Sequence, residues 1–202
     1  ALSYRTGIHI HLQETIYQRM YSESRFGKTP LAHLRDLEFL GPDVSCAHGV
    51  WLTDTDIDIL EETGTCVCHN ASSNLRLKSG VAPVNALNAK GVTVAIGIDE
   101  AGLNDDNDIL QEMRLVQKLH RVPGMGTPNP TSHQVLQMAT ANGAQATLFA
   151  DRIGSLEIGK RADIVLINLT HITEPYLDPN TNIVDAILYR GRGLDVDTVI
   201  VD

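Results

Sequence analysis

The chain has 202 residues, of which 43% are hydrophobic, and this is enough apolar material for one large domain or two small ones. Its formal net charge of −9, together with the lack of a long Lys/Arg run, argues against a nucleic-acid-binding surface. No apolar run approaches the roughly 18 residues of a membrane-spanning helix and no signal peptide is recognisable, so we expect no membrane partner either.

Cysteine is rare, with only Cys46, Cys66 and Cys68 in the chain. An odd and sparse set is typical of a reducing compartment without a disulfide framework, and we expect a cytoplasmic protein. Cys66 and Cys68 form a C-x-C pair, whereas thiolate zinc sites use more widely spaced pairs with further partners. Both are therefore interpreted as core thiols.

Short apolar segments alternate with helical patterns over the first 121 residues. Strands are expected at 7–12, 43–48, 64–69 and 92–98, each apolar on both faces like the strands of a buried parallel sheet. Helices are expected at 29–41, 53–64, 80–91 and 105–120; the first has Thr29 as a possible N-cap, followed by Pro30. Four successive β-α units predict an α/β fold with a parallel sheet and right-handed crossovers.

The pattern changes after residue 121. A Pro/Gly loop over 122–130 precedes a helix pair or one interrupted helix over 131–149, with a break expected at Asn142 and Gly143. From residue 152 onward we predict only β-structure, with strands within 153–169, 182–191 and 194–202.

Polar residues fall at the ends of the four N-terminal strand candidates. They are His11, Glu14, His48, His69, Asn70, Ser73, Asn74 and Asp99. The C-terminal edge of a parallel sheet is where sites are built, and a buried Asp or His must be paired, hydrogen-bonded or ligated. This distribution predicts a functional site at that edge.

His9 and His11 face the same side of the first strand, because side chains at positions i and i+2 share a face. His9 lies deeper in the strand and is interpreted as structural. The H-x-x-E spacing from His11 to Glu14 favours a functional role for His11. Asp99 follows seven uncharged residues, and a functional role is favoured there and at His48.

For His69 and Asn74 two interpretations stay open, because side-chain to backbone hydrogen bonds that fix the loop would explain them equally well. The remaining histidines lie in expected helices or loops with no polar cluster nearby. We interpret them as surface or capping residues: His33, His120, His133 and His171.

Four segments follow one another in the same order as four motifs of a known family: "HIHLQET" (9–15), "CAHGVWL" (46–52), "HNASSNLRLKSGVAPV" (69–84) and "IGIDEAGLNDD" (96–106). They resemble the fifth-strand H-x-x-E, the sixth-strand histidine, the H-x-P-x-S-N stretch after strand seven and the eighth-strand G-x-D of the metal-dependent amidohydrolase superfamily. The resemblance is to its cytosine deaminase, guanine deaminase and triazine chlorohydrolase branch. The segments at 138–166 and 195–202 are similar to that family's closing helix and C-terminal strands, so the resemblance covers essentially the whole chain.

The resemblance implies a partial (β/α)8 barrel, with strands five to eight in residues 1–151, and the C-terminal strands of a small β-sandwich in residues 152–202. A complete barrel needs about 250 residues, so we expect the C-terminal half of a longer enzyme. The family also implies a homo-oligomer in the intact protein.

The resemblance further implies one divalent metal, with zinc as the first candidate and iron or manganese as alternatives. It would be held here by His11 and Asp99 and by two first-strand histidines outside this chain. Metal-activated water would attack a ring carbon, with Glu14 as general acid, His48 bonded to the attacking oxygen and Asp99 as proton acceptor. Substrate contacts are expected from His69, Asn70, Asn74 and Glu100.

The expected reaction is hydrolytic deamination of a purine, pterin, pyrimidine or triazine-like ring. The alternatives are an amidase or cyclic-amide hydrolase of the same superfamily and a non-catalytic scaffold. The chain departs from the family at Ala71, which replaces a proline, and in the acidic residues Glu100, Asp105 and Asp106 near the expected site. These departures leave the identity of the substrate open.

Overall fold

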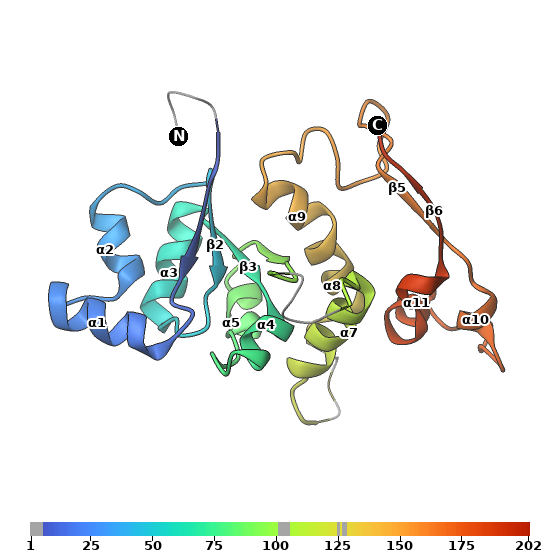
Figure 1. Cartoon of the computed structure of the whole chain (residues 1–202), viewed down its shortest axis with the longest axis horizontal. Helices are drawn as coiled ribbons and strands as arrows, with labels where there is room; N and C mark the ends of the chain where they lie inside the picture. Colours follow the sequence, from blue (N-terminus) through green and yellow to red (C-terminus); the bar gives the residue numbers. More distant parts are fainter. Residues whose placement is uncertain (1–5, 101–105, 125, 127–128) are drawn as a thin grey trace.

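A computed structural model of the chain describes residues 6–100, 106–124, 126 and 129–202. Its centre is a parallel sheet of four strands, β1 (Ile8–Leu12), β2 (Val44–His48), β3 (Cys66–His69) and β4 (Val94–Ile96), in that spatial order (Figure 1). Leu12 is paired with His48, and His69 with Ile96. The strand ends therefore meet at one edge, and the predicted α/β fold with a parallel sheet is confirmed.

Five helices accompany these strands: α1 (Ile16–Phe26), α2 (Pro30–Asp36), α3 (Asp54–Thr63), α4 (Ala71–Arg76) and α5 (Val84–Ala89). The predicted start of α2 is confirmed, since the Thr29 side chain accepts a hydrogen bond from the amide of Ala32. In α3, Thr53 and Asp56 form a capping box and Gly64 ends the helix at φ 69°.

The sequence did not predict α1 and α4. Helix α1 buries only Ser22 and exposes Tyr17, Met20 and Tyr21, so it has no apolar stripe directed at the core. Helix α4 has six residues, too few for a periodic pattern to be recognised.

Three further helices follow β4: α7 (Ile109–Leu119), α8 (Ser132–Ala139) and α9 (Ala141–Ala146). A helix pair was expected, but its break lies at Thr140 (φ −124°, ψ −90°) and not at Asn142 and Gly143. Asn142 lies inside α9, where its side-chain amide donates a 2.8 Å hydrogen bond to the carbonyl of Val94. This hydrogen bond attaches α9 to β4.

The prediction of purely β structure after residue 152 is wrong. Strands β5 (Ile164–Ile167) and β6 (Val196–Ile200) form an antiparallel pair, but α10 (Thr170–Thr173), α11 (Ile183–Arg190) and the short 3-10 helix η2 (Gly193–Asp195) lie between them. Asn182 caps α11 by accepting a hydrogen bond from the amide of Val184. Its apolar residues Ile183, Val184, Ile187 and Leu188 have helical spacing, which outweighs their β-branched character.

The core lies on one face of the sheet. Val44, Cys46 and Val67 pack there with Leu31 of α2 and Leu60 of α3. Cys66 is buried as predicted, whereas Cys68, which was also expected in the core, is only partly buried. Cys46 is buried too, and all three are free thiols. None of the helices in the described residues has the length and apolar character needed to cross a membrane.

The two faces of strand β1 carry different side chains. Ile8 and Ile10 pack against the core, while His9 and His11 are exposed on the opposite face. The open face of β1 therefore carries the imidazoles.

Candidate functional site

The backbone turns sharply at two of the strand ends. His48 and Asp99 have left-handed φ angles of 74° and 61°, a region that residues with a Cβ rarely adopt. Such conformations persist where the surrounding structure enforces them, and they concentrate at functional sites. The turns aim both side chains at the edge of the sheet.

A third turn follows β1 at Gln13, whose φ is 48° and whose side chain is fully buried. The side-chain amide of Gln13 donates to the carbonyl of Trp51 at 2.8 Å and to Asp56 Oδ2 at 3.0 Å. These bonds fix the short connection between His11 and Glu14.

The four residues predicted to carry the chemistry lie together around the buried ring of His48. That ring stacks on the ring of His11 with centroids 5.2 Å apart. Its Nε2 lies 3.8 Å from Glu14 Oε2 and 3.9 Å from Asp99 Oδ2. Three strands and the turn after β1 thus bring two imidazoles and two carboxylates to one place.

Side chains of α4, the helix after β3, hold two members of this cluster. His48 Nδ1 donates to Asn74 Oδ1 at 2.8 Å, and the Ser73 hydroxyl donates to Asp99 Oδ2 at 2.6 Å. Because the Asn74 oxygen can only accept, Nδ1 carries a proton in this arrangement, and Nε2 is the ring atom that faces the two carboxylates.

Glu14 has its own partner, since the Ser79 hydroxyl donates to Glu14 Oε1 at 3.1 Å. Ser79 was not among the predicted site residues. Its signal in the sequence is weak, because serine is common in loops and only the fold brings it to Glu14.

His9 lies one pleat away from this cluster. Its Nδ1 is 2.8 Å from the hydroxyl of Ser45 on β2. Partial burial lowers the pKa of His9, and the nearby His11 and His48 lower it further. A hydrogen bond to the neighbouring strand fits the interpretation of His9 as structural, although its ring is more exposed than that interpretation assumed.

The donor set fits part of a divalent-metal site. His48 Nε2 is buried without a hydrogen-bond partner, and His11 and Asp99 add a nitrogen and an oxygen donor of the kind that zinc, iron and manganese accept. Within the described residues, no group of three or more His, Cys, Asp or Glu side chains is placed to hold a metal ion. The residues of this chain therefore fit a partial ligand set.

His69 lies inside the protein, with no exposed surface, and its Nε2 is 2.9 Å from Nε2 of His120. Burial lowers the pKa of His69 to about 3, helped by the proximity of His120 and His48, and burial lowers the pKa of His120 to about 4. Both rings are therefore neutral near pH 7. His120 is the C-cap residue of α7, as one of its two interpretations predicted, but it is not a surface residue, because its ring is buried against His69.

The other predicted substrate-binding residues differ in exposure. Asn74 is buried against His48, and Asn70 is buried with its Oδ1 accepting a 3.8 Å hydrogen bond from the Cys68 thiol. A Cβ at Gly97 would lie 2.5 Å from Asn70 Oδ1, so this position requires glycine. Glu100 is exposed, and its amide donates to Asp99 Oδ1 at 2.8 Å. Asp105 lies outside the described residues.

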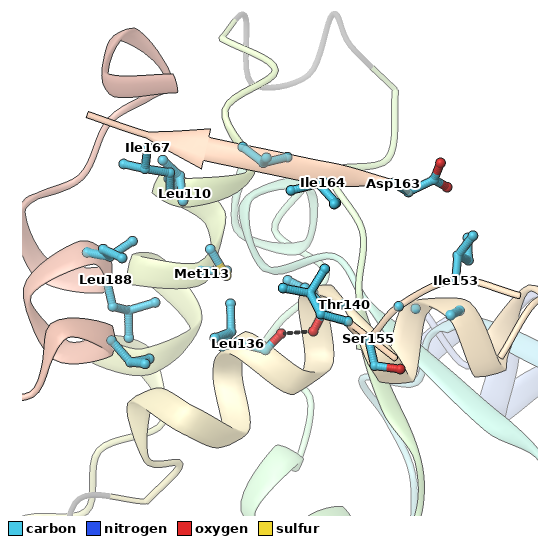
Figure 2. A pocket seen from close by; sticks show the side chains of 18 of the residues that line it. Leu110, Met113, Leu136, Thr140, Ile153, Ser155, Asp163, Ile164, Ile167 and Leu188 are labelled. Atoms are coloured by element: carbon cyan, nitrogen blue, oxygen red, sulfur yellow. Dashed lines mark hydrogen bonds between the residues drawn. The ribbon is translucent and has the colours of Figure 1, made fainter. Parts of the chain in front are cut away.

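A cavity away from the polar cluster is chemically different. Its volume is about 650 Å³, and it is bounded by α7, α8, α9, α11 and β5 (Figure 2). Apolar side chains such as Met113, Leu136 and Leu188 form most of its wall, and the hydroxyl of Thr140 is already bonded to the carbonyl of Leu136. None of the predicted catalytic residues lines it, so the polar cluster is the candidate site for chemistry.

Comparison with known proteins gives concordant results. Residues 1–202 match the model of the amidohydrolase family. The chain is 39% identical over 197 residues to a 5-methylthioadenosine/S-adenosylhomocysteine deaminase of Caldanaerobacter subterraneus subsp. tengcongensis, covering 98% of this chain and 45% of the relative. The chain thus spans slightly less than half the length of this relative.

Solved structures agree with this result. An adenosine deaminase from Xanthomonas campestris with bound zinc superposes with a TM-score of 0.89 at 33% identity, over 96% of this chain and 44% of that one. A zinc complex of an atrazine chlorohydrolase from Arthrobacter aurescens superposes with a TM-score of 0.87 at 26% identity, over 100% of this chain and 44% of that one.

Proposed function

The chain belongs to the amidohydrolase family, and from this premise we propose that its protein is a metal-dependent hydrolase that removes the amino group of an adenine-type ring. The position of one carboxylate oxygen of Glu14 and one of Asp99 within 4 Å of His48 Nε2 carries this proposal. Two of the proteins compared above are named as deaminases of adenine nucleosides, and these favour a purine among the ring classes expected from the sequence. The third, the atrazine chlorohydrolase, represents the triazine class at a lower identity of 26%.

We propose that residues 1–151 form half of a (β/α)8 barrel and residues 152–202 part of a small β-sandwich. The four-stranded parallel sheet and the coverage of 44–45% of the relatives support the first part. The antiparallel pair β5–β6 supports the second.

One divalent metal, zinc in the first instance, is proposed to be held by His11 and Asp99 together with ligands from the rest of the protein. When bound, such an ion lowers the pKa of a water molecule toward neutrality and so makes it a nucleophile near pH 7. The Ser73 hydroxyl holds Asp99 in place for this role through its 2.6 Å hydrogen bond.

Three residues of the cluster, Glu14, His48 and Asp99, have proton-handling roles. Glu14 donates a proton to the ring nitrogen next to the attacked carbon, and Asp99 accepts a proton from the attacking water. Asp99 then passes this proton to the amino group, the C–N bond breaks, and ammonia leaves. The new hydroxyl group on the ring carbon returns a proton to Glu14 as it becomes a carbonyl. His48 Nε2 accepts a hydrogen bond from that water when neutral and donates one to the developing oxyanion when protonated. Asn74 keeps Nε2 directed at the reacting oxygen by holding Nδ1.

Substrate contacts are proposed for Asn70, Asn74 and Glu100 near the cluster. His69 is kept as a substrate-contact candidate through Nδ1, which is buried without a hydrogen-bond partner, because its Nε2 faces His120. The protein is proposed to act in the cytoplasm, in keeping with its three free thiols, and as a homo-oligomer, following the family resemblance.

The test is ammonia release by the full-length protein with adenosine and 5′-methylthioadenosine, after loading with zinc, iron or manganese. We expect metal-dependent turnover of at least one nucleoside, with loss of activity after chelation. Hydrolysis of a cyclic amide in place of deamination would contradict the proposal, as would inactivity on both nucleosides with every metal.

A further inference from the structure

We propose that α7 sets the geometry of the catalytic cluster from outside, and that Glu112 is the positioning residue through which it does so. This inference rests on the proposed function and deepens it, because it names a residue that controls the site without touching the substrate.

The cluster depends on where α4 lies. All of the first four residues of α4 are buried, from Ala71 to Asn74. Two of them reach the catalytic groups directly: Ser73 bonds to Asp99, and Asn74 bonds to His48. A displacement of this first turn would therefore move both an expected metal ligand and the ring that meets the attacking oxygen.

Helix α4 does not hold its own start. Its N-cap residue, Asn70, makes no side-chain hydrogen bond to the amides of the first turn. The amide of Ser72 instead donates a 2.9 Å hydrogen bond to Glu112 Oε1, 40 residues further along the chain on α7. Glu112 thus replaces a local cap and joins α7 to the turn that carries Ser73 and Asn74.

The choice of a carboxylate at this position points to a specific role. Glu112 has no exposed surface, its Oε2 is buried without a partner, and burial raises its pKa. A buried carboxyl group is unfavourable unless its hydrogen bonds are needed. An apolar side chain would pack there without this penalty but would leave the Ser72 amide unpaired.

A second contact fixes the other end of the same helix. His120, directly after α7, meets His69 at 2.9 Å, and its carbonyl accepts a 2.8 Å hydrogen bond from the side chain of Asn85. Helix α7 is therefore attached to the β3–α4 segment at both His69 and Ser72. These two attachments fix the position of α7 relative to the β3–α4 segment. Through its bond to Ser72, Glu112 therefore fixes the position of Ser73 and Asn74 as well.

The experiment compares Glu112→Met, Glu112→Gln and Met113→Ala in the full-length protein. Methionine keeps the volume and helix propensity of Glu112 but removes the acceptor, whereas glutamine keeps an acceptor oxygen without the charge. Met113 is buried on the same helix, away from α4, and serves as the control for destabilisation alone.

Two readouts need no substrate: zinc affinity, and amide hydrogen exchange of Asn74, whose N–H bonds to the carbonyl of Asn70. For Glu112→Met we expect zinc affinity and kcat to fall by roughly 10–100-fold with KM nearly unchanged. Exchange at Asn74 should rise by about tenfold, the equivalent of one hydrogen bond. In Glu112→Gln the zinc affinity, kcat and the exchange rate of Asn74 should stay within about threefold of wild type, because the amide oxygen of glutamine retains the bond to Ser72.

Met113→Ala should lower the melting temperature but leave zinc affinity and Asn74 exchange unchanged. The proposal is overturned if Glu112→Met leaves both readouts at wild-type values, or if Met113→Ala changes them equally. If Glu112→Met does not fold, Glu112→Gln decides. Zinc affinity and Asn74 exchange within about threefold of wild type would support positioning by the hydrogen bond, and a loss of more than about tenfold in zinc affinity would overturn it. A protein that neither binds zinc nor releases ammonia would refute the proposed function, while the exchange rates would still decide the role of Glu112.

Discussion

Replacement of Glu14 by glutamine separates proton transfer from every other property of the site. Glu14 Oε1 accepts a hydrogen bond from Ser79 at 3.1 Å, and glutamine can accept the same bond through its amide oxygen. The side chain is 18% exposed and nearly isosteric with glutamine, so the fold and the position of the side chain should persist. What glutamine lacks is a proton that it can give to the substrate ring.

The expected effect follows from this single loss. A general acid contributes roughly 10²–10⁴-fold to the rate, which corresponds to about 2.7–5.4 kcal/mol of activation free energy at 1.36 kcal/mol per tenfold. Glu14 is not an expected metal ligand, so the metal content of Glu14→Gln should equal that of the wild type. The lost rate should appear in kcat, with a smaller change in KM.

The assay measures kcat and KM by ammonia release and metal content by elemental analysis, on the full-length enzyme. Ser79→Ala is the matched control, because it removes the hydrogen bond to Glu14 but keeps the ionisable carboxyl group. A loss of less than about fivefold in Glu14→Gln with metal retained would remove Glu14 from the proton path. An equal loss in Ser79→Ala would show that the orientation of the side chain matters more than its proton.

Three further predictions address the metal and the buried histidines. In His11→Ala the metal content should fall sharply while the fold is retained. In His9→Ala only the bond to Ser45 should be lost, which lowers the unfolding free energy by about 0.5–1.5 kcal/mol and leaves the metal content unchanged. Metal analysis and melting temperature test both variants, and the reverse pattern would exchange the two assignments. Ser73→Ala should weaken metal affinity by roughly 10–100-fold, measured by competition with a chelator, because Asp99 loses its 2.6 Å partner; unchanged affinity would contradict this. The pKa values of His69 and His120 are lowered to about 3 and about 4, so between about pH 6.5 and about pH 4 the unfolded chain binds more protons than the native one. The unfolding free energy should therefore fall as pH is lowered through this window, by up to about 1.4 kcal/mol per pH unit for each ring, and equal urea-unfolding free energies at about pH 7 and about pH 5 would refute it.

The sequence by itself predicted the parallel sheet and the residues that lie together at its C-terminal edge. Strands β2, β3 and β4 are short and mostly apolar, and a polar residue ends or closely follows each, as at His48 and His69; in β1 the apolar residues alternate with His9 and His11. Strands of a parallel sheet must align their C-terminal ends, so residues at those ends gather whatever the details of the fold. For this reason the grouping of Glu14, His48 and Asp99 could be predicted from order and spacing alone.

The elements that the sequence did not predict are those in which residue propensity and helix capping or packing favour different structures. In 183–190 the β-branched residues favour a strand, but the Asn182 cap and the helical spacing of Ile187 and Leu188 against Ile183 favour a helix, and packing selects the helix. Helix α1 has no buried apolar stripe, so its sequence resembles that of a loop. Such elements form because of their caps and their neighbours, which a periodic pattern does not contain.

Only the tertiary structure decided which polar residues support the site. Ser79 lies 65 residues from Glu14, Glu112 lies 40 residues from Ser72, and His120 lies 51 residues from His69. No spacing rule connects residues so far apart, because their contact depends on how α4 and α7 pack over the sheet. A serine, a glutamate and a histidine are ordinary surface residues in a sequence, and they become parts of the site only once folding removes them from water and leaves each with one available partner.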